Sequence, residues 1–358
     1  MRVLALMKYD KRAASTRQRL LQFLPYLEQN GIFFEVSPLL QSKYLEDLTN
    51  GNRVKIYSVV KSYIDRFRMI SKIRTFDAVF IQYETAPYLP SVFEWIFTLF
   101  DRPIICDYDD AIFHQYDTHN SKLVRYLLGN KLTPLLRAAA MCICGNAYIE
   151  SYAAKYCRNT VVIPTVVDTD VYMPGSPHFD RALTIGWIGS PSTWRYLESL
   201  LPEILPTIEA AGARLRVVGA GVRAKGITGV DAVDWTEESE VTEVQSFDIG
   251  IMPLPDENWA RGKCGYKLIQ YMACGVPVVA SPVGVNVEIV SDGQNGYLAS
   301  NAEAWRIALT NLINDSAVRQ KMGEHGRRRV VEHYSLQSQK SRLLKAISGI
   351  LNNRNFKS

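Results

Sequence analysis

The stretch that decides the fold runs from residue 248 to residue 296 and reads DIGIMPLPDENWARGKCGYKLIQYMACGVPVVASPVGVNVEIVSDGQNG. Its apolar runs Asp248 to Met252 and Pro277 to Ala280 predict two strands, and Tyr266 to Cys274 between them predicts a helix. A glycine-bearing basic loop leads into this helix. The free backbone N–H groups and the dipole of a helix N-terminus both favour phosphate. The stretch therefore predicts either an anion site or a purely structural turn.

The same alternation of strand and helix patterns extends outward over the whole chain. Short β-branched runs followed by segments of helical period are typical of parallel sheets covered by helices, so the predicted class is α/β. The expected strands of the first half are Val3 to Met7, Phe33 to Val36, Ala78 to Gln82, Pro103 to Asp107, Met141 to Cys144 and Val161 to Ile163. Further strands are expected at Leu183 to Ile188 and Leu215 to Val218, and helices at Arg17 to Asn30, Leu197 to Ala211, Ala302 to Asp315 and Leu336 to Leu351.

The length of 358 residues favours two domains, at about 150 residues for each domain. Pro164 to Asp180 carries three prolines and reads as a linker between them. We expect residues 1–170 and residues 181–334 to form two Rossmann-like domains. The amphipathic segment within residues 335–358 is expected to form a helix across the domain junction.

Composition and charge exclude several classes of protein. The chain is 47% hydrophobic and 22% charged, which is typical of globular proteins and not of disordered ones. A net charge of +5 without an extended basic stripe does not indicate a nucleic-acid binder. Apolar runs are too short for a membrane span, and the N-terminus lacks the features of a secretory signal, so a cytoplasmic location is expected. Six scattered cysteines without a CxxC pair indicate neither disulfides nor a metal site.

A glycine motif in the second half suggests a dinucleotide site but lacks its context. Gly219, Gly221 and Ala224 follow the strand pattern LRVV and match GxGxxA. The next acidic residue that could bind the ribose, Asp234, comes too early for the NAD fingerprint. A cofactor of this kind is therefore not expected.

The residues KLIQYMACGVPVVASPVG (267–284), Glu288 and DGQNGYL (292–298) closely resemble the C-terminal signature of retaining glycosyltransferase family 4. The likeness runs from the first βα turn to the Tyr334-Ser-Leu segment. It implies the GT-B fold, in which two Rossmann-like domains with parallel sheets face each other across a cleft. It also implies that residues 1–170 form an acceptor-binding domain and residues 181–334 a nucleotide-sugar-binding domain, with a nucleotide diphosphate sugar as co-substrate and no resident metal or other cofactor.

The resemblance and the chemistry of the residues together suggest the donor site. By resemblance, the loop and helix from Gly262 to Gln270 hold the diphosphate and sugar, the segment WIGSPSTWRYL (187–197) contacts the diphosphate, and the glycine turn with the following Val233-Asp234-Trp235 encloses the nucleotide. The expected donor-binding residues are Ser190, Thr193, Arg195, Gly219, Trp235, Lys263, Cys264, Gly265, Tyr266, Lys267 and Gln270.

Two positions depart from the family pattern. The family's paired glutamates fall on Gly262 and Gln270. Gln270 keeps a carbonyl oxygen that can accept from ribose hydroxyls, without the strength of a charged acceptor. Gly262 cannot contact the sugar through a side chain, and Asp256 or Glu257 in the preceding loop is the alternative.

The first half contributes charged residues to the expected cleft. Arg17 and Arg19 lie where the first loop enters its helix and could contact phosphate or acceptor. Asp109 and Asp110 follow the strand that ends near Asp107, and strand ends are where open α/β sheets build their sites. Either carboxylate could orient the acceptor hydroxyl or accept its proton.

A basic amphipathic segment, Arg53 to Arg74, contains seven basic residues and one acidic residue among apolar ones. Such a helix either presents a solvated face or lies on an anionic membrane. The resemblance favours peripheral association with the inner face of the membrane, because many relatives act on lipid-linked acceptors.

The sequence thus predicts a retaining, metal-independent glycosyltransferase that moves a sugar from a nucleotide diphosphate donor to a hydroxyl of a glycan or lipid-linked acceptor. Two alternatives remain open: a nucleotide-sugar epimerase or hydrolase of the same fold, and a catalytically silent nucleotide-sugar-binding subunit, which the missing glutamates suggest.

Overall fold

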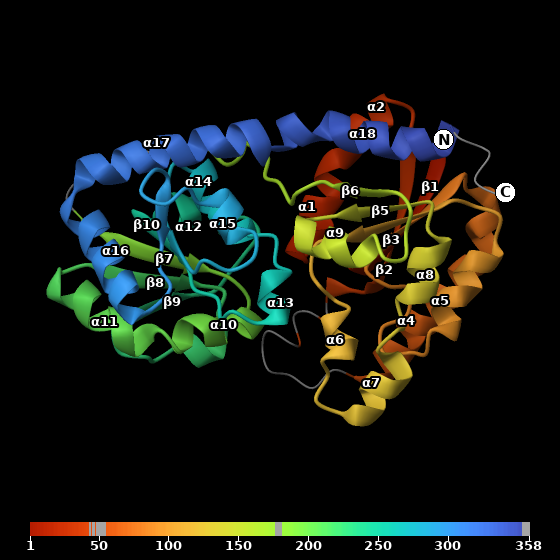
Figure 1. The fold of residues 1–358 in the computed structure, drawn as a ribbon, viewed down its shortest axis with the longest axis horizontal. Helices are drawn as coiled ribbons and strands as arrows, with labels where there is room; N and C mark the ends of the chain where they lie inside the picture. Colours follow the sequence, from red (N-terminus) through yellow and green to blue (C-terminus); the bar gives the residue numbers. More distant parts are fainter. Residues whose placement is uncertain (43, 45–46, 48–54, 176–180, 353–358) are drawn as a thin grey trace.

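The computed structural model describes residues 1–42, 44, 47, 55–175 and 181–352. Two parallel six-stranded sheets dominate it, each packed between helices (Figure 1). The strand order is β2-β1-β3-β4-β5-β6 in the first sheet and β12-β11-β10-β7-β8-β9 in the second. The α/β class predicted from the sequence is confirmed.

The elements have the following bounds. The first sheet contains β1 (Arg2–Tyr9), β2 (Phe33–Leu40), β3 (Ala78–Gln82), β4 (Ile104–Tyr108), β5 (Met141–Cys144) and β6 (Thr160–Val162). The second contains β7 (Thr184–Ile188), β8 (Arg214–Val218), β9 (Val230–Val233), β10 (Ile249–Met252), β11 (Val278–Ala280) and β12 (Gly296–Leu298). The helices of the first half are α1 (Ala14–Arg19), α2 (Leu24–Gln29), α4 (Ile56–Arg68), α5 (Val92–Ile96), α6 (His114–Asp117), α7 (Lys122–Leu128), α8 (Thr133–Ala138) and α9 (Ala147–Ala153). Those that follow are α10 (Pro191–Glu198), α11 (Leu201–Ala210), α12 (Glu240–Gln245), α13 (Asn258–Arg261), α14 (Tyr266–Ala273), α15 (Asn286–Ile289), α16 (Ala302–Asn314), α17 (Ser316–His333) and α18 (Leu336–Asn352).

Strand β1 shows why the central strands read as continuous apolar runs. Its residues alternate between the two faces of the sheet, as the period of two requires. Leu4 and Leu6 pack into one hydrophobic core, and Val3 and Ala5 into the core on the opposite face. Because helices cover both faces of the sheet, the middle residues of the strand are shielded from solvent on either face, and this run is apolar throughout.

The first predicted helix is interrupted. Helix α1 ends at Arg19, a short 3-10 turn follows, and α2 begins at Leu24. Pro25 has no N–H to donate to a carbonyl one turn earlier, so a continuous helix through this point would lose a hydrogen bond. In the first turn of α2 the proline costs nothing, because N–H groups there lack helical partners anyway.

The elements that were not predicted include β9, β12 and α17. Strands β9 and β12 lie at the outer edges of the second sheet, where a short strand needs no strong apolar pattern. Helix α17 is mostly polar and carries three consecutive arginines from position 327. Its contact with the rest of the molecule depends on small residues instead of an apolar stripe.

Helices α17 and α18 follow one another along one side of both halves (Figure 1). In α18, Leu343, Ile347 and Ile350 enter the core of the first half beside β1. The chain thus crosses between the halves twice, once near Val167 and once at Tyr334–Ser335. A backbone bridge joins the two crossings, with Val167 N–H donating to the Tyr334 carbonyl at 3.2 Å and Leu336 N–H donating to the Val167 carbonyl at 2.8 Å.

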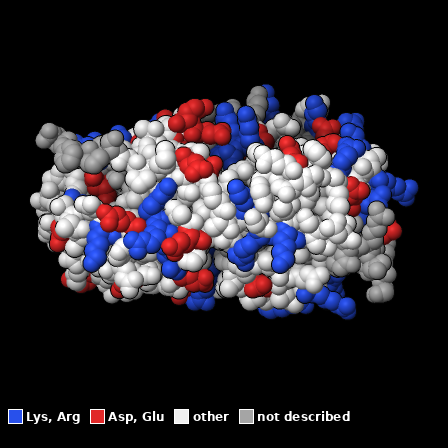
Figure 2. Space-filling model, turned by 90° about the horizontal axis from the view of Figure 1, so that it is seen from above, with Lys and Arg blue, Asp and Glu red and all other residues white. Residues whose placement is uncertain are grey.

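The face seen from the side of α17 and α18 carries basic and acidic side chains interspersed with uncharged ones (Figure 2). Mixed signs at this spacing partly cancel, so this face presents no field of a single sign. Within the described residues, no helix has the length and apolar character needed to cross a bilayer.

We expect Gly323→Ala to lower the free energy of unfolding by about 1–3 kcal/mol, because overpacked contacts cost that much. A Cβ at this buried position of α17 would lie 2.0 Å from the carbonyl oxygen of Gly275, at the end of α14. Urea denaturation followed by circular dichroism measures the change.

The matched control is Gly349→Ala in α18, where a Cβ would meet no atom within 4 Å. We expect this exposed helical substitution to be neutral or to stabilise by up to about 1 kcal/mol. Equal effects of both substitutions would contradict the packing role of Gly323.

Candidate active site

The carboxyl end of the first sheet lies directly against a loop of the second half. A Cβ on Gly262 would lie only 2.2 Å from the Cβ of Ala111, and a Cβ on Gly145 only 2.2 Å from the Sγ of Cys264. Neither contact leaves room for a side chain. The two glycines therefore let the loop 262–265 approach the ends of β4 and β5.

Asn146 fixes this contact from the first half. Its Oδ1 accepts from the Ile149 N–H at 2.9 Å and so caps the N-terminus of α9. Its Nδ2 donates to the carbonyls of Gly262 and Lys263, each at 3.1 Å. One buried amide thus holds a helix of the first half and the loop of the second.

Asp109 is buried at the centre of this junction. Burial, and secondarily the neighbouring Asp110, raise the pKa of its carboxyl to about 7. The neighbouring Tyr83 hydroxyl opposes that rise in pKa, while Oδ1 has no hydrogen-bond partner among the described residues. A carboxyl group that titrates near neutral pH and keeps a free oxygen is suited to proton transfer.

Asp110 and Lys263 face each other across the junction. Their carboxylate Oδ1 and ammonium Nζ are 3.7 Å apart, and both side chains are partly shielded from solvent. The pair brings one predicted catalytic residue of the first half next to one predicted donor-binding residue of the second.

The prediction for Arg19 is wrong. Its guanidinium is buried, binds both oxygens of Asp107, and donates to the Ile163 carbonyl at 2.6 Å. Burial raises the pKa of the Asp107 carboxyl, and Arg19 opposes the rise. Residues two apart on a helix point in nearly opposite directions, so Arg17 and Arg19 cannot both face the cleft. Arg19 stabilises the strand end that carries Asp109 instead.

The N-terminus of α14 has the form of an anion site. Gly265 precedes the helix in the left-handed conformation, with φ +66°, which turns the loop sharply into the helix. In the described part of the chain, the backbone N–H groups of Cys264, Gly265 and Tyr266 have no acceptor. Three free donors at a helix N-terminus, together with the helix dipole, favour an anionic ligand.

Lys267 lies beside these donors in the first turn of α14. Its ammonium is 5.3 Å from the centre of the Trp187 ring. Burial and the nearby Lys263 lower the pKa of Lys267 to about 7. With Thr193, these two lysines line a small cavity, so three of the predicted donor-binding residues meet there.

Ser190 and Arg195 take structural positions in the segment after β7. Ser190 is the N-cap of α10 and forms a capping box with Thr193. Arg195 is largely exposed, donates to the Tyr196 hydroxyl at 2.9 Å and lies 3.4 Å from Glu257. The capping role of Ser190 is thus observed, and Arg195 is held outside the lysine-lined cavity.

A second polar network surrounds Glu240, at the start of α12. Gln270 Nε2 donates to Glu240 Oε1 at 2.9 Å, and Trp235 Nε1 donates to Glu240 Oε2 at 2.7 Å. From the first half, Arg17 donates to the same Oε2 at 3.0 Å and lies 5.2 Å from the Trp235 ring centre. The structure therefore brings Arg17, Trp235 and Gln270 together, and Gln270 acts as a donor to a carboxylate.

Gly219 lies between this network and the end of β7. It has φ +81°, and a Cβ would lie 2.4 Å from the Gly189 carbonyl oxygen and 3.0 Å from the Trp235 Cβ. Only a glycine fits this turn, so the GxGxxA match reflects a close backbone approach.

The sequence analysis missed Asn146, Tyr83 and Glu240. Glu240 belongs to the acidic run EESE, which reads as a solvated helix start. Asparagine is a common N-cap residue, so the capping role of Asn146 could have been predicted from the sequence. The contacts across the junction join residues more than 100 positions apart, and no local pattern indicates them.

Comparison with known proteins identifies a domain and a fold. Residues 182–315 match the family model described as glycosyl transferases group 1. The chain is 27% identical over 211 residues to D-inositol 3-phosphate glycosyltransferase of Corynebacterium aurimucosum, covering 49% of this chain and 48% of that protein. It matches curated relatives of this kind over less than half of their own length.

Solved structures match almost the entire chain. Sucrose-phosphate synthase of Thermosynechococcus elongatus superposes with a TM-score of 0.70 at 14% identity, covering 98% of this chain and 99% of that one. Anabaena HepE in complex with UDP-glucose gives 0.70 at 15% identity, covering 98% and 100%. At these identities the similarity shows the fold, and the GT-B architecture expected from the sequence is confirmed.

We expect Lys267→Ala to weaken the binding of inorganic pyrophosphate by about 1.5–3 kcal/mol, the range for hydrogen bonds to charged groups. Isothermal titration calorimetry measures the affinity, with the exposed Lys321→Ala in α17 as the matched control. An equal loss in both variants would contradict an anion site at α14.

The lowered pKa of Lys267 adds a pH dependence to this binding. Bound pyrophosphate favours the charged ammonium, so the protein should take up a proton on binding above pH 7, and the affinity should fall as the pH rises. Lys267→Arg remains charged throughout, and the difference between the two proteins removes the titration of pyrophosphate itself.

Proposed function

We propose that this protein is a glycosyltransferase that moves a sugar from a nucleotide diphosphate donor to a hydroxyl group of a glycan or lipid-linked acceptor. The observation that carries the proposal is the meeting of two sets of groups at the junction. Free N–H groups and lysines come from the second half, and a carboxyl group with a raised pKa comes from the first. The departing diphosphate needs the N–H groups and lysines, the attacking hydroxyl needs the carboxyl group, and the reaction requires the two sets side by side.

The second half would bind and stabilise the diphosphate. Negative charge develops on the diphosphate as the bond to the sugar breaks, and prepositioned donors stabilise such charge without reorganisation. The N–H groups before α14 supply fixed dipoles, while Lys263 and Lys267 supply mobile charge. Gln270 and Trp235, both held in place by Glu240, would contact the nucleoside.

The first half would position the acceptor hydroxyl. Asp109 and Asp110 lie at the strand end, and Asp110 is 3.7 Å from Lys263 of the phosphate-binding loop. An acceptor held by these carboxylates therefore approaches from the side on which the diphosphate leaves. This arrangement supports transfer with retention of the anomeric configuration.

We also propose that transfer requires no resident metal and no further cofactor. The lysines and the helix N-terminus provide the positive charge that a metal provides in other enzymes. No group of three or more His, Cys, Asp or Glu suited to a metal ion occurs among the described residues.

UDP sugars are the first donors to test. The neighbouring HepE structures contain UDP, UDP with glucose, and UDP-glucose. The Gln270 side chain, which donates to Glu240, keeps an amide oxygen that can accept a hydrogen bond from a ribose hydroxyl, and this supports a nucleoside site in the second half.

Helix α4 supports peripheral association with a membrane at the cytoplasmic face. Ile56 and Tyr57 are each 80% exposed, and Val60 and Ile64 follow on the same side of the helix. Single exposed apolar residues are ordinary, but a stripe of four on one helix needs a partner. We propose that this stripe lies in an anionic lipid surface.

The basic residues of this segment divide into two groups. Lys55, Lys61, Arg68, Lys72 and Arg74 are exposed. Arg66 is buried and donates to the Met7 and Ser37 carbonyls, so it takes no part in a lipid surface, contrary to the sequence interpretation. Arg53 lies outside the described residues.

The adjacent helix extends the apolar surface. Phe67 of α4 packs against Phe93 of α5, with ring centres 5.3 Å apart. The exposed Val92 and Trp95 lie on α5, and Leu99 follows in the next turn. Tryptophan, here Trp95, is typical of the bilayer interface.

We expect product analysis to detect a glycoside when the protein is incubated with a UDP sugar and an acceptor extract from its source, and NMR to show the donor's anomeric configuration retained in it. EDTA should leave the rate unchanged. Free sugar or an epimer as the sole product would favour the hydrolase or epimerase alternative, and donor binding without turnover would favour the silent subunit.

We expect Asp109→Asn to lower turnover by about 100-fold or more, the size of general base effects, while donor affinity is retained. With the pKa of Asp109 raised to about 7, its carboxylate form accumulates above that pH, so the native rate should rise through pH 7 and the variant rate should not. Asp231→Asn, on the edge strand β9, is the control. A variant with the native rate and pH profile would end the role of Asp109.

We expect the protein to float with vesicles that contain phosphatidylglycerol and to be released by high salt, since each basic residue contributes about 1 kcal/mol within a Debye length of about 8 Å. Val60→Ser and Lys61→Glu should each reduce the bound fraction. Val222→Ser and Lys321→Glu, at exposed positions of the second half, should not. Binding that ignores lipid charge, salt and both α4 substitutions would contradict the membrane surface.

A further inference from the structure

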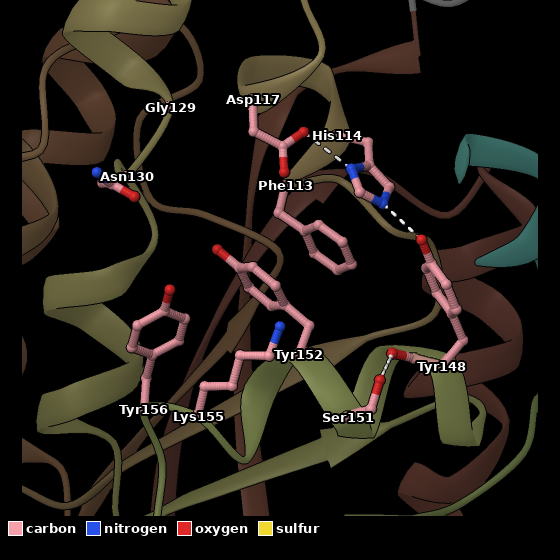
Figure 3. A pocket seen from close by; sticks show the side chains of 10 residues that line it. All are labelled: Phe113, His114, Asp117, Gly129, Asn130, Tyr148, Ser151, Tyr152, Lys155 and Tyr156. Atoms are coloured by element: carbon pink, nitrogen blue, oxygen red, sulfur yellow. Dashed lines mark hydrogen bonds and ion pairs between the residues drawn. The ribbon is translucent and has the colours of Figure 1, made fainter. Parts of the chain in front are cut away.

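A cavity of about 350 Å³ lies in the first half, outside the donor site (Figure 3). Residues of α6, the turn after α7, and α9 line it. This volume lies at the small end of the range for ligand pockets, about 300 to 1,000 Å³. Nothing in the described donor site accounts for it.

The cavity lies beside the proposed reaction centre. Phe113 and His114 in its wall follow Asp110 after two and three intervening residues, and α9 begins at the Asn146 cap that binds the loop 262–265. On the far side of the junction, α13 packs against α6, and the Arg261 charge acts on the Tyr148 hydroxyl. A ligand in the cavity would therefore extend toward the acceptor position.

Three tyrosines give the cavity an aromatic wall. Tyr148, Tyr152 and Tyr156 recur every four residues, so they lie along one side of α9 and the turn after it. Tyr152 stacks on Phe113 with ring centres 3.7 Å apart and an interplanar angle of 8°, and Tyr156 meets it edge-on. The wall is rigid, because its central ring stacks on Phe113 and contacts Tyr156.

A histidine held in one orientation forms the opposite wall. His114 Nδ1 lies 2.8 Å from Asp117 Oδ1, and its Nε2 lies 2.8 Å from the Tyr148 hydroxyl (Figure 3). Helix α6 is held in place by a further hydrogen bond, because the buried Tyr116 hydroxyl donates to Glu84 at 2.7 Å. The polar groups of this wall thus need no rearrangement before a ligand binds.

The remaining polar groups offer both donors and acceptors. The Lys155 ammonium lies 6.0 Å from the Tyr152 ring centre and has no carboxylate partner among the described residues. Asn130 and the Tyr156 hydroxyl line the same space, and the Asp117 side chain is 36% exposed. An apolar ligand would leave these groups unpaired, and a phosphate would meet the Asp117 carboxylate.

We propose that this cavity is an acceptor subsite that binds one sugar ring of the acceptor glycan. A pyranose has C–H faces that pack on aromatic rings and hydroxyl groups that both donate and accept hydrogen bonds. The tyrosine wall meets the first need, and Lys155, Asn130 and Asp117 meet the second. The proposal rests on the proposed glycosyltransferase function, because it identifies the ligand as part of the acceptor.

Saturation-transfer NMR with the full-length protein tests the subsite. The probes are the methyl glycosides of glucose, galactose, mannose and N-acetylglucosamine, each measured with UDP present. We expect at least one probe to receive saturation, with a dissociation constant that rises about tenfold in Lys155→Ala, as for a lost hydrogen bond to a charged group. Ser151→Trp, which places an indole at the exposed rim on α9, should abolish the signal.

Lys321→Ala is the matched control and should bind the probes like the native protein. The proposal is overturned if no glycoside gives a signal, or if the signal survives in Ser151→Trp. A thermal-shift titration with UDP on the same variants checks that each is folded and reports on the donor site alone. If UDP binds without a pocket-dependent glycoside signal, the subsite fails and the donor site stands. If the glycoside signal depends on the pocket while none of UDP, GDP, ADP and dTDP binds, the proposed function fails instead.

Discussion

The amide of Asn146 is the interaction on which the arrangement of the site depends. An N-cap is usually a local device, because it satisfies one free N–H at the start of its own helix. Here the same side chain also binds two carbonyls of a loop more than 100 residues away. The position of α9, and with it the tyrosine wall, is therefore coupled to the loop that precedes α14. Removing the Asn146 amide would release α9, the tyrosine wall and the loop before α14 together.

The charges on the two sides of this contact explain one another. Carboxylates gather at the end of β4 and lysines gather before and within α14, and each set alone is destabilised by burial and by like charge. Burial raises the pKa of Asp109 and lowers that of Lys267, so both groups titrate near neutral pH. Bringing the halves together places opposite charges within reach, as in the pair of Asp110 and Lys263. An anionic ligand would complete the compensation on the lysine side.

The central strands and the α14 loop could be predicted from the sequence because each depends on local physics. A strand buried on both faces must be continuously apolar, and a glycine before a helix start predicts a sharp turn into that helix. The edge strands β9 and β12 are under no such constraint, and the interruption at Pro25 requires reading a single residue against a long helical pattern. The orientation of Arg19 was missed because its partner Asp107 lies 88 positions away. Glu240 was missed because an acidic helix start is indistinguishable from a solvated surface until Arg17 and Trp235 are seen around it.

The bridge between the two crossings of the chain has a mechanical meaning. Two chain connections at distant points would restrict rotation of one half relative to the other. Here the segment around Val167 and the segment at Tyr334–Ser335 are hydrogen-bonded to each other, so they form one pivot. Opening the cleft can then proceed as a rotation about that point, in which few backbone angles change and neither core is disturbed. In such a rotation, residues farthest from Val167 are displaced most. A ligand that binds both halves far from Val167 therefore restricts the rotation more than one that binds close to it.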